Sequence, residues 1–510
     1  ETKLSVSYCW QVEKNFMSGV LFLSKEDIKE KVEPFIHARL TTFQYELNSI
    51  PSFQLLTYNR FDLGLKLAYL SYKDVLPELA TEIYHHDIRS QTLGKFEEYG
   101  NEEKSSFDIY IEHFEKTFID IKQNGFDENK TLVPLSFRNT ILNGAHRVAS
   151  AIFLNKDVTC VNTELDEIYP NYQYFIDRKV PEDILDIGAI KFCEYAENTY
   201  LAFLWPSGRE NYNLTENLFS NIVYKKKIKL NSRGGLNLLI ELYKHMDWVG
   251  TNKNNFPGAH QKLMECFTDF EEFTVILFQS ESLEKVQEIK KRARDINQIG
   301  FSSVHITDTL EEVNRISRLI FNRNGLHFLN YGKPYKLKST LSMVQCLHSL
   351  KADLLSRTVL DGSMTLSIYG IREARDIDYF SENVLPTNSC RFELELHDSQ
   401  LIYHGLDKRE LIHNPKYSFE YLGIKFVSFN QTFKFKKARN EEKDMNDCQM
   451  MISLIDNNGL KFFYSSLKQN FFYKKLVIKN RLQNFIFLIL KNTGTYEMVR
   501  SLYRKLRGRK

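Results

Sequence analysis

The chain lacks several features that would place it in a class at once. Its seven cysteines are scattered, odd in number and without a Cys-x-x-Cys pair. This argues against a disulfide framework and a structural zinc site, and it favours a reducing compartment. No apolar run approaches the roughly 20 residues that span a bilayer, and no cleavable signal peptide is evident. The start at Glu1, without an initiator methionine, indicates a processed end or a fragment. We expect a folded cytoplasmic protein.

Net charge is also small, at +3, but it is unevenly distributed. Residues 461–510 hold thirteen Lys/Arg and the single acid Glu497, interleaved with aromatic and aliphatic side chains. The pattern predicts a basic amphipathic helical tail that lies on an anionic membrane surface, which would make the protein peripheral on the inner membrane face. The alternative is a packed terminal helix with a solvated basic face. Patterns of nucleic-acid binders, Gly- and Arg-rich or zinc-like, are lacking, which argues against nucleic acid as a partner.

Two aspartates, Asp376 and Asp378, follow a Gly362-Ser363 turn and predict a metal site. Alternation along a strand would place both carboxylates on one face. Such a pair suits Mg²⁺, which binds through one or two carboxylates and substrate phosphates. The turn offers backbone N–H groups and a hydroxyl to a phosphate. An Asp-x-Asp pair also occurs in turns and solvated strand ends without any metal.

A second informative segment runs over residues 423–447. It predicts a strand from Ile424 to Phe429, then a helix with several cations, then another helix. The cations of the first helix are Lys434, Lys436, Lys437 and Arg439, and the second helix opens with Lys443-Asp444 and Asp447. The lysines could neutralise triphosphate charge during transfer, with Lys437 in the catalytic role. The alternative is a solvated helical face.

Together these segments resemble the nucleotidyltransferase superfamily of the polymerase-beta-like fold. Its members place Gly-Ser before Asp-x-Asp on the next strand, and the abortive-infection and antitoxin-linked type adds a lysine-bearing helix and a Lys/Arg-Asp-x-x-Asp ending. The resemblance implies Mg²⁺ on Asp376 and Asp378 and a nucleotide at Gly362 and Ser363. Superfamily members usually carry a further carboxylate on a later strand. The candidates are Glu393 and Glu395, and we assign Glu395 to the predicted metal set.

A third motif, Asn143-Gly144-Ala145-His146-Arg147, opens a predicted helix after paired strands. A helix N-terminus supplies donors, and Arg147 supplies a planar fork for phosphate oxygens. Alternatively, His146 is a core histidine and Arg147 a surface ion-pair partner. The segment resembles the ParB/sulfiredoxin-like fold, whose members bind nucleotide phosphates at this turn. The resemblance implies that Asn143, Gly144, His146 and Arg147 bind ATP or another NTP.

Other polar groups have local explanations beside functional ones. Asp127 and Glu128 could be a base or metal ligands of a kinase, or part of a helix-terminating turn. In the middle region, Thr309-x-x-Glu312 before an apolar-periodic run predicts a capping box, which we favour over a metal site with His305 and Asp308. Gly234-Gly235, Tyr243, Trp248 and Gly250 could line a substrate cleft, or form a turn and a core.

These observations predict an α+β or α/β multidomain chain with five parts. They are a helical lead-in (1–100), a ParB/sulfiredoxin-like nucleotide-binding domain (101–200), an α/β middle domain (201–334), a nucleotidyltransferase-like domain with a mixed sheet (335–460) and a basic helical tail (461–510). The combination resembles proteins of bacterial surface-polysaccharide gene clusters.

The resemblance implies an Mg²⁺-dependent nucleotidyl- or phosphoryltransferase of capsule or O-antigen synthesis. Its substrates would be ATP or another NTP and a sugar or glycan-phosphate acceptor. The ParB-like part would be a second nucleotide site, which could serve a kinase reaction. Two alternatives stay open. One is a nucleotide-sensing regulatory protein without turnover, and the other is an antitoxin-linked nucleotidyltransferase that acts on RNA or protein.

Overall fold

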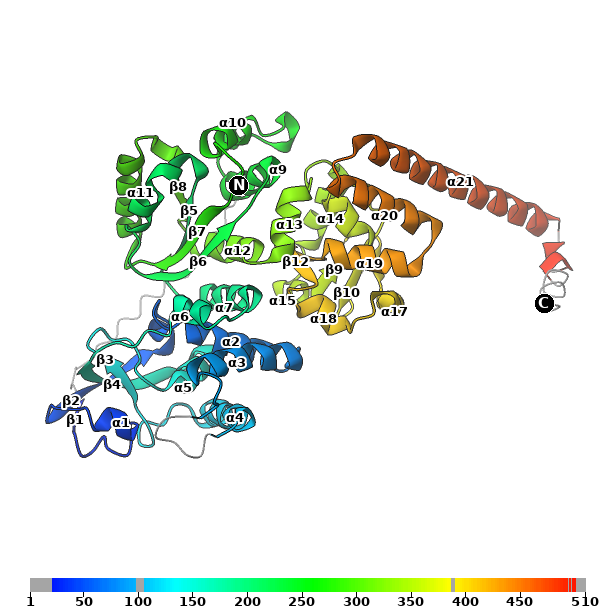
Figure 1. The fold of residues 1–510 in the computed structure, drawn as a ribbon. Helices are drawn as coiled ribbons and strands as arrows, with labels where there is room; N and C mark the ends of the chain where they lie inside the picture. Colours follow the sequence, from blue (N-terminus) through cyan, green and yellow to red (C-terminus); the bar gives the residue numbers. More distant parts are fainter. Residues whose placement is uncertain (1–20, 98–104, 387–389, 494, 497, 501–510) are drawn as a thin grey trace, which may run out of the picture. The chain divides into compact units, whose positions relative to one another are not determined.

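The computed structural model describes residues 21–97, 105–386, 390–493, 495–496 and 498–500 (Figure 1). Helices predominate and accompany three small sheets, which confirms the predicted mixed multidomain class. The chain divides into two compact units. The first comprises Glu1–Ser71, Ala80–Thr199 and Asn221–Tyr224, and the second comprises Tyr72–Leu79, Tyr200–Ser220 and Lys225–Lys510.

The first unit contains a four-stranded sheet in the order β1-β2-β4-β3. Its strands are β1 (Leu21–Ser24), β2 (Gln44–Pro51), β3 (Val133–Ser136) and β4 (Asp157–Leu165). Only the β3–β4 pairing is parallel. The main helices are α2 (Phe61–Tyr72), α3 (Pro77–Gln91), α4 (Phe107–Asn124), α5 (Ala145–Phe153) and α7 (Glu182–Tyr195), with the short α1 (Pro34–His37) and α6 (Tyr172–Asp177). The segment predicted as a helical lead-in therefore also supplies two strands, and β2 shows why: exposed and buried side chains alternate at its start.

The middle part has a sheet in the order β6-β7-β5-β8. The strands are β5 (Thr199–Leu204), β6 (Ile222–Ile228), β7 (Phe273–Gln279) and β8 (Val304–Ile306), and β8 pairs antiparallel with β5. The helices are α8 (Tyr212–Glu216), α9 (Ser232–Tyr243), α10 (Pro257–Cys266), α11 (Leu283–Asn297) and α12 (Leu310–Ile320). The predicted N-cap is confirmed, because the Thr309 hydroxyl accepts a bond from the Glu312 backbone N–H at the start of α12. The second bond of the predicted capping box is not formed, since the Glu312 carboxylate accepts from the Asp308 N–H and not from the Thr309 N–H.

The following part contains a five-stranded sheet in the order β11-β10-β9-β13-β12. Its strands are β9 (Thr358–Leu360), β10 (Ile377–Ser381), β11 (Leu394–Leu396), β12 (Ser418–Tyr421) and β13 (Ile424–Val427). The helices are α13 (Arg323–Tyr331), α14 (Lys338–Leu347), α15 (Ala352–Ser356), α16 (Ser363–Ile368), α17 (Leu401–His404), α18 (Lys408–His413), α19 (Phe429–Arg439) and α20 (Glu442–Ile455). Val359, Phe380 and Val427 from three adjacent strands share a core cluster with Leu411 and Ile412 of α18. The sheet is thus held on one side by α18.

The basic segment begins as a long helix, α21 (Gly459–Asn492), which projects from the bundle in Figure 1. Many of its apolar side chains are exposed, among them Phe471, Ile478 and Phe485. Residues 501–510 of the predicted tail lie outside the described part of the chain. Among the described residues, no helix combines the length and apolar character needed to cross a membrane.

Cysteine pairing differs from the expectation drawn from composition. Cys346 at the end of α14 forms a disulfide with Cys390, and their Cα atoms are 5.5 Å apart. The other described cysteines, Cys160, Cys193, Cys266 and Cys448, are free and buried. A single long-range pair leaves no spacing pattern in the sequence, which is why the composition did not reveal it.

Candidate metal centre

Three carboxylates converge at one edge of the five-stranded sheet. Strands β10 and β11 run parallel, and their register places Asp378 opposite Glu395. Asp376 lies two residues before Asp378, so the two side chains share a face, while Ile377 and Tyr379 are buried on the other. One ligand atom from each of Asp376, Asp378 and Glu395 lies within 4.8 Å of the others. This group could hold a metal ion.

The charge of the cluster fits a cation. Burial raises the pKa of Asp376, and the neighbouring Asp378 carboxylate raises it further. Close carboxylates repel one another, and a divalent cation between them would relieve that repulsion. All the candidate ligand atoms are carboxyl oxygens, and hard cations such as Mg²⁺ prefer oxygen ligands. The residues present therefore fit the metal that the resemblance implies.

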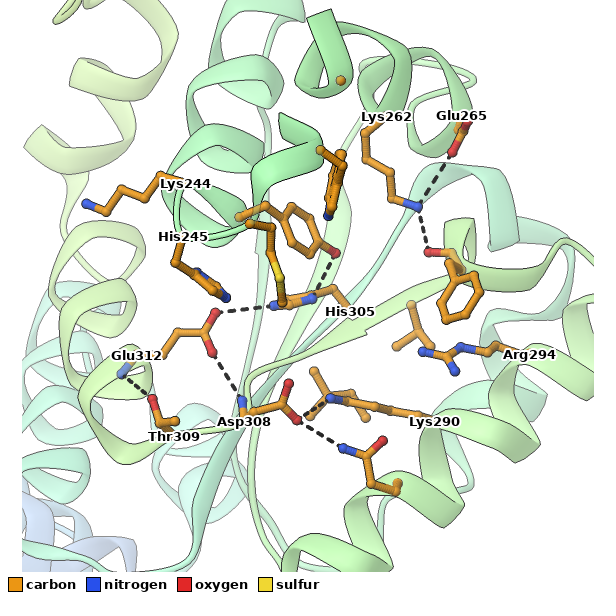
Figure 2. A pocket seen from close by; sticks show the side chains of 18 of the residues that line it. Lys244, His245, Lys262, Glu265, Lys290, Arg294, His305, Asp308, Thr309 and Glu312 are labelled. Atoms are coloured by element: carbon orange, nitrogen blue, oxygen red, sulfur yellow. Dashed lines mark hydrogen bonds and ion pairs between the residues drawn. The ribbon is translucent and has the colours of Figure 1, made fainter. Parts of the chain in front are cut away.

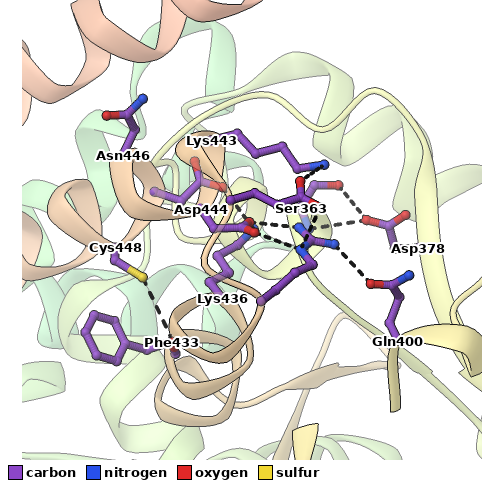
Figure 3. A network of polar contacts seen from close by, with 12 residues as sticks. Ser363, Asp378, Gln400, Phe433, Lys436, Lys443, Asp444, Asn446 and Cys448 are labelled. Atoms are coloured by element: carbon purple, nitrogen blue, oxygen red, sulfur yellow. Dashed lines mark hydrogen bonds and ion pairs between the residues drawn. The ribbon is translucent and has the colours of Figure 1, made fainter. Parts of the chain in front are cut away.

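The Gly362-Ser363 turn lies against Asp378. Gly362 has φ +54°, and a Cβ atom there would stand 3.1 Å from Oδ2 of Asp378. The Ser363 hydroxyl donates to the same oxygen at 3.1 Å (Figure 3). The backbone N–H of Asp361 donates to the Asp378 carbonyl at 2.9 Å, which fixes the turn to β10. The sequence predicted a phosphate role for Ser363, whereas here its hydroxyl orients an acidic ligand.

Two histidines that the sequence argument did not single out complete this site. His397 Nδ1 lies 3.0 Å from Oδ2 of Asp361, and its Nε2 lies 3.1 Å from Oδ1 of Asp378. His404 Nε2 is 3.2 Å from the same Asp361 oxygen. Burial opposes protonation of His397, but bonds to Asp361 and Asp378 outweigh it and raise its pKa to about 10. Both oxygens of Asp378 are thus held by protein groups.

A signal for His397 was present in the sequence. It follows Glu395 by two residues, at the end of the same strand, so alternation places it on the side of Asp378. Asp361 is fully buried and stands directly before the Gly362-Ser363 turn. Buried carboxylates need partners, and the two histidines hold the pKa of Asp361 well below its usual range against the effect of burial.

Behind the cluster lies a buried ionic network at the junction of α19 and α20 (Figure 3). Arg439 binds Asp444 through two bonds of 2.7 and 2.8 Å. Arg372 binds Asp447 in the same manner, at 2.7 and 2.9 Å. Lys436 joins the halves, at 3.3 Å from Asp444 and 2.9 Å from Asp447. The Lys/Arg-Asp-x-x-Asp ending therefore fastens two helices together.

The lysines of α19 separate by burial. Lys436 is 1 % exposed and belongs to the network, whereas Lys434 and Lys437 are exposed. The structure places Lys437, the lysine predicted as catalytic, on the solvent side of α19. Its catalytic role stays a prediction.

The Asn143–Arg147 turn is filled by protein contacts. Gly144, with φ +88°, caps α5, and its Cβ position is occupied by the Arg147 guanidinium at 2.8 Å. Arg147 Nη2 donates to Glu33 at 2.6 Å, and Asn143 Oδ1 accepts from the Gly144 N–H at 2.5 Å. His146 Nε2 lies 2.9 Å from the Tyr84 hydroxyl. These contacts match the alternative of an ion pair and a packed histidine. Asp127 and Glu128 lie in the turn after α4, where Asp127 accepts from the Asn129 N–H.

No family model, curated protein or solved structure matches this chain. Any function proposed for the chain therefore rests on its own residues and their geometry.

Proposed function

We propose that this chain is a divalent-metal-dependent nucleotidyl- or phosphoryltransferase whose metal ligands are Asp376, Asp378 and Glu395. The convergence of these three carboxylates from adjacent parallel strands supports the proposal most strongly. Mg²⁺ bound there would neutralise charge on the phosphoryl group that is transferred.

The surrounding residues prepare the ligands. His397 is held between Asp361 and Asp378, so its Nε2 fixes one oxygen of Asp378, while the Ser363 hydroxyl fixes the other. Such outer bonds orient a ligating carboxylate before any ligand arrives. The buried Arg439–Asp444 and Lys436–Asp447 pairs stiffen the helix junction behind the site.

The substrates follow from the resemblance. The donor would be ATP or another NTP, and the acceptor a sugar or glycan phosphate of bacterial surface-polysaccharide synthesis. A nucleotide at the Asn143–Arg147 turn would have to replace the Glu33 contact of Arg147. We therefore assign the transfer reaction to the acidic cluster.

Label transfer tests this function. The full chain is incubated with radiolabelled ATP or CTP, Mg²⁺ and candidate sugar phosphates, beside Asp378→Asn and the control Glu373→Gln, which changes an exposed acid near the site. We expect transfer by the wild type and the control, and a rate at least about 100-fold lower in Asp378→Asn. Nucleotide binding without transfer to any acceptor would instead identify a sensing protein. Labelling of RNA or protein in a lysate, with sugars unlabelled, would move the acceptor to another class.

A further inference from the structure

A large cavity in the middle part of the chain has no role in the reaction proposed above. It lies between the end of α9, helices α10 and α11, strand β8 and the start of α12 (Figure 2). Its volume is about 1050 Å³, at the upper end of the range of small-molecule sites. All of its lining residues lie between Tyr243 and Arg315, so the cavity shares no residue with the acidic cluster.

One wall of this cavity is cationic. It is formed by Lys262 of α10 and by Lys290 and Arg294 of α11 (Figure 2). The lysine side chains are nearly buried, at 10 % and 8 % exposure. Lys262 Nζ donates to the Phe301 carbonyl at 2.9 Å, and Lys290 Nζ lies 2.5 Å from Asp308. Lys262 Nζ also lies 3.6 Å from Glu265, so each lysine has an acidic neighbour, and Arg294 adds a third cation to the same wall.

Arg294 is the most specific anion-binding group of this wall. Its guanidinium carbon lies 4.1 Å from the centre of the Phe301 ring, so the guanidinium group is stacked on the ring and held flat. A planar guanidinium fork matches the oxygens of a phosphate. Arg294 lines the cavity in this orientation and is thus arranged to bind an anion there.

The opposite wall carries hydrogen-bond acceptors for hydroxyl groups. His305 of β8 lies 2.9 Å from the Tyr243 hydroxyl through Nδ1 and 3.5 Å from Glu312 through Nε2. The second distance is longer than a well-formed hydrogen bond. Glu312 Oε2 accepts from the Asp308 backbone N–H at 3.1 Å, which orients the carboxylate. Carboxylate and imidazole groups that are held in this way can bind the hydroxyls of a polyol.

Two exposed aromatic side chains, Trp248 and Phe301, also line the cavity, at 48 % and 69 % exposure. Large exposed rings are characteristic of sites that stack on a flat or weakly polar ligand face, such as a sugar ring or a base. Cations, hydroxyl acceptors and aromatic rings therefore face one space.

We propose that this cavity binds a small molecule that joins a phosphate to several hydroxyl groups. Arg294 and Lys262 would bind the phosphate, while His305 and Glu312 would bind hydroxyls. Sugar phosphates and nucleoside monophosphates share this chemistry. The site is additional to the proposed transferase centre, and its existence does not depend on that reaction.

Calorimetric titration of the full chain tests the proposal with four probes: inorganic phosphate, glucose, glucose 1-phosphate and uridine monophosphate. We expect at least one of the two phosphate esters to bind at least about tenfold more tightly than phosphate or glucose alone, since only the esters engage both walls. A preference between the two esters identifies the ligand class. Asp378→Asn should bind the preferred ester like the wild type, which separates this site from the transferase centre.

Matched variants on one helix locate the site. Arg294→Gln should weaken binding of the preferred ester at least about tenfold, while Arg292→Gln, an exposed position of α11, should leave it unchanged. Arg294→Lys keeps the positive charge but loses the planar fork, so its affinity for the preferred ester should lie between those of Arg294→Gln and Arg292→Gln. This variant replaces Arg294→Gln in the test if Arg294→Gln does not fold. The proposal is overturned if no ester binds more tightly than inorganic phosphate, or if the Arg294 variants bind the ester as well as Arg292→Gln does.

Discussion

Lys436 and Lys437 of α19 offer a direct test of the buried ionic network, because these neighbours in sequence point to opposite environments. Lys436 is buried in the network, whereas Lys437 is exposed to solvent. We consider Lys436→Met and Lys437→Met. Lys436 contacts two buried carboxylates, Asp444 and Asp447, which become partly uncompensated when the ammonium group is removed. Breaking a buried ion pair from one side costs about 3–5 kcal/mol. Arg439 and Arg372 each keep two bonds to one of these carboxylates. We therefore expect Lys436→Met to lose unfolding free energy at the lower end of this range, about 3 kcal/mol.

The measurement is thermal unfolding of both variants at neutral pH. For a unit of this size, about 3 kcal/mol corresponds to a fall in Tm of about 6 °C for Lys436→Met. Lys437→Met changes an exposed side chain and should stay within about 0.5 kcal/mol of the wild type. Equal melting temperatures for the two variants, or a larger loss for Lys437→Met, would refute the placement of Lys436 as the buried member. Transfer activity of Lys437→Met separately tests its predicted catalytic role.

Three further outcomes are expected. Burial lowers the pKa of His327 to about 4, so folding favours the neutral imidazole. The protein therefore keeps its full stability above the unfolded pKa of about 6.5. As the pH falls toward 4, the free energy of unfolding decreases by up to about 3 kcal/mol. The drop in Tm between pH 7.5 and pH 5 should therefore be smaller in His327→Gln. Gly362→Ala adds a methyl group 3.1 Å from Oδ2 of Asp378 at a left-handed φ, so calorimetry should show weaker Mn²⁺ binding; unchanged affinity would contradict this packing. Helix α21 has seven basic and no acidic residues beside exposed apolar ones, so the chain should float with vesicles containing about 30 % phosphatidylserine, and a variant with Gln at those basic positions should not.

Short-range patterns in the sequence predict much of the candidate site. The alternation around Ile377 placed Asp376 and Asp378 on one face, and the structure agrees. The N-cap at Thr309 is also predictable from the sequence, because its capping bond joins residues that lie three positions apart. Glu395 could be named as a candidate but not placed, since its approach to Asp378 depends on the register of β10 and β11.

Contacts between residues far apart in the sequence could not be predicted from local patterns. His397 reaches Asp361 across 36 residues and His404 reaches it across 43, so no local spacing predicts that both histidines meet one buried carboxylate. The run of cations in α19 has no apolar stripe that would fix its phase, and Lys436 and Lys437 were therefore indistinguishable. The motif at Arg147 was read correctly as a helix start, but its partner Glu33 lies 114 residues away.

The most direct test of the central claim is metal binding at the acidic cluster. Mn²⁺ is titrated into the full chain, the Asp378→Asn variant and the Glu373→Gln control, and free Mn²⁺ is followed by electron paramagnetic resonance. We expect one Mn²⁺ site in the wild type and the control, and loss of this site or a weakening of its affinity by at least about tenfold in Asp378→Asn. Mn²⁺ binding by Asp378→Asn that equals the wild type, or no binding by the wild type, would contradict the assignment of Asp376, Asp378 and Glu395 as a metal centre.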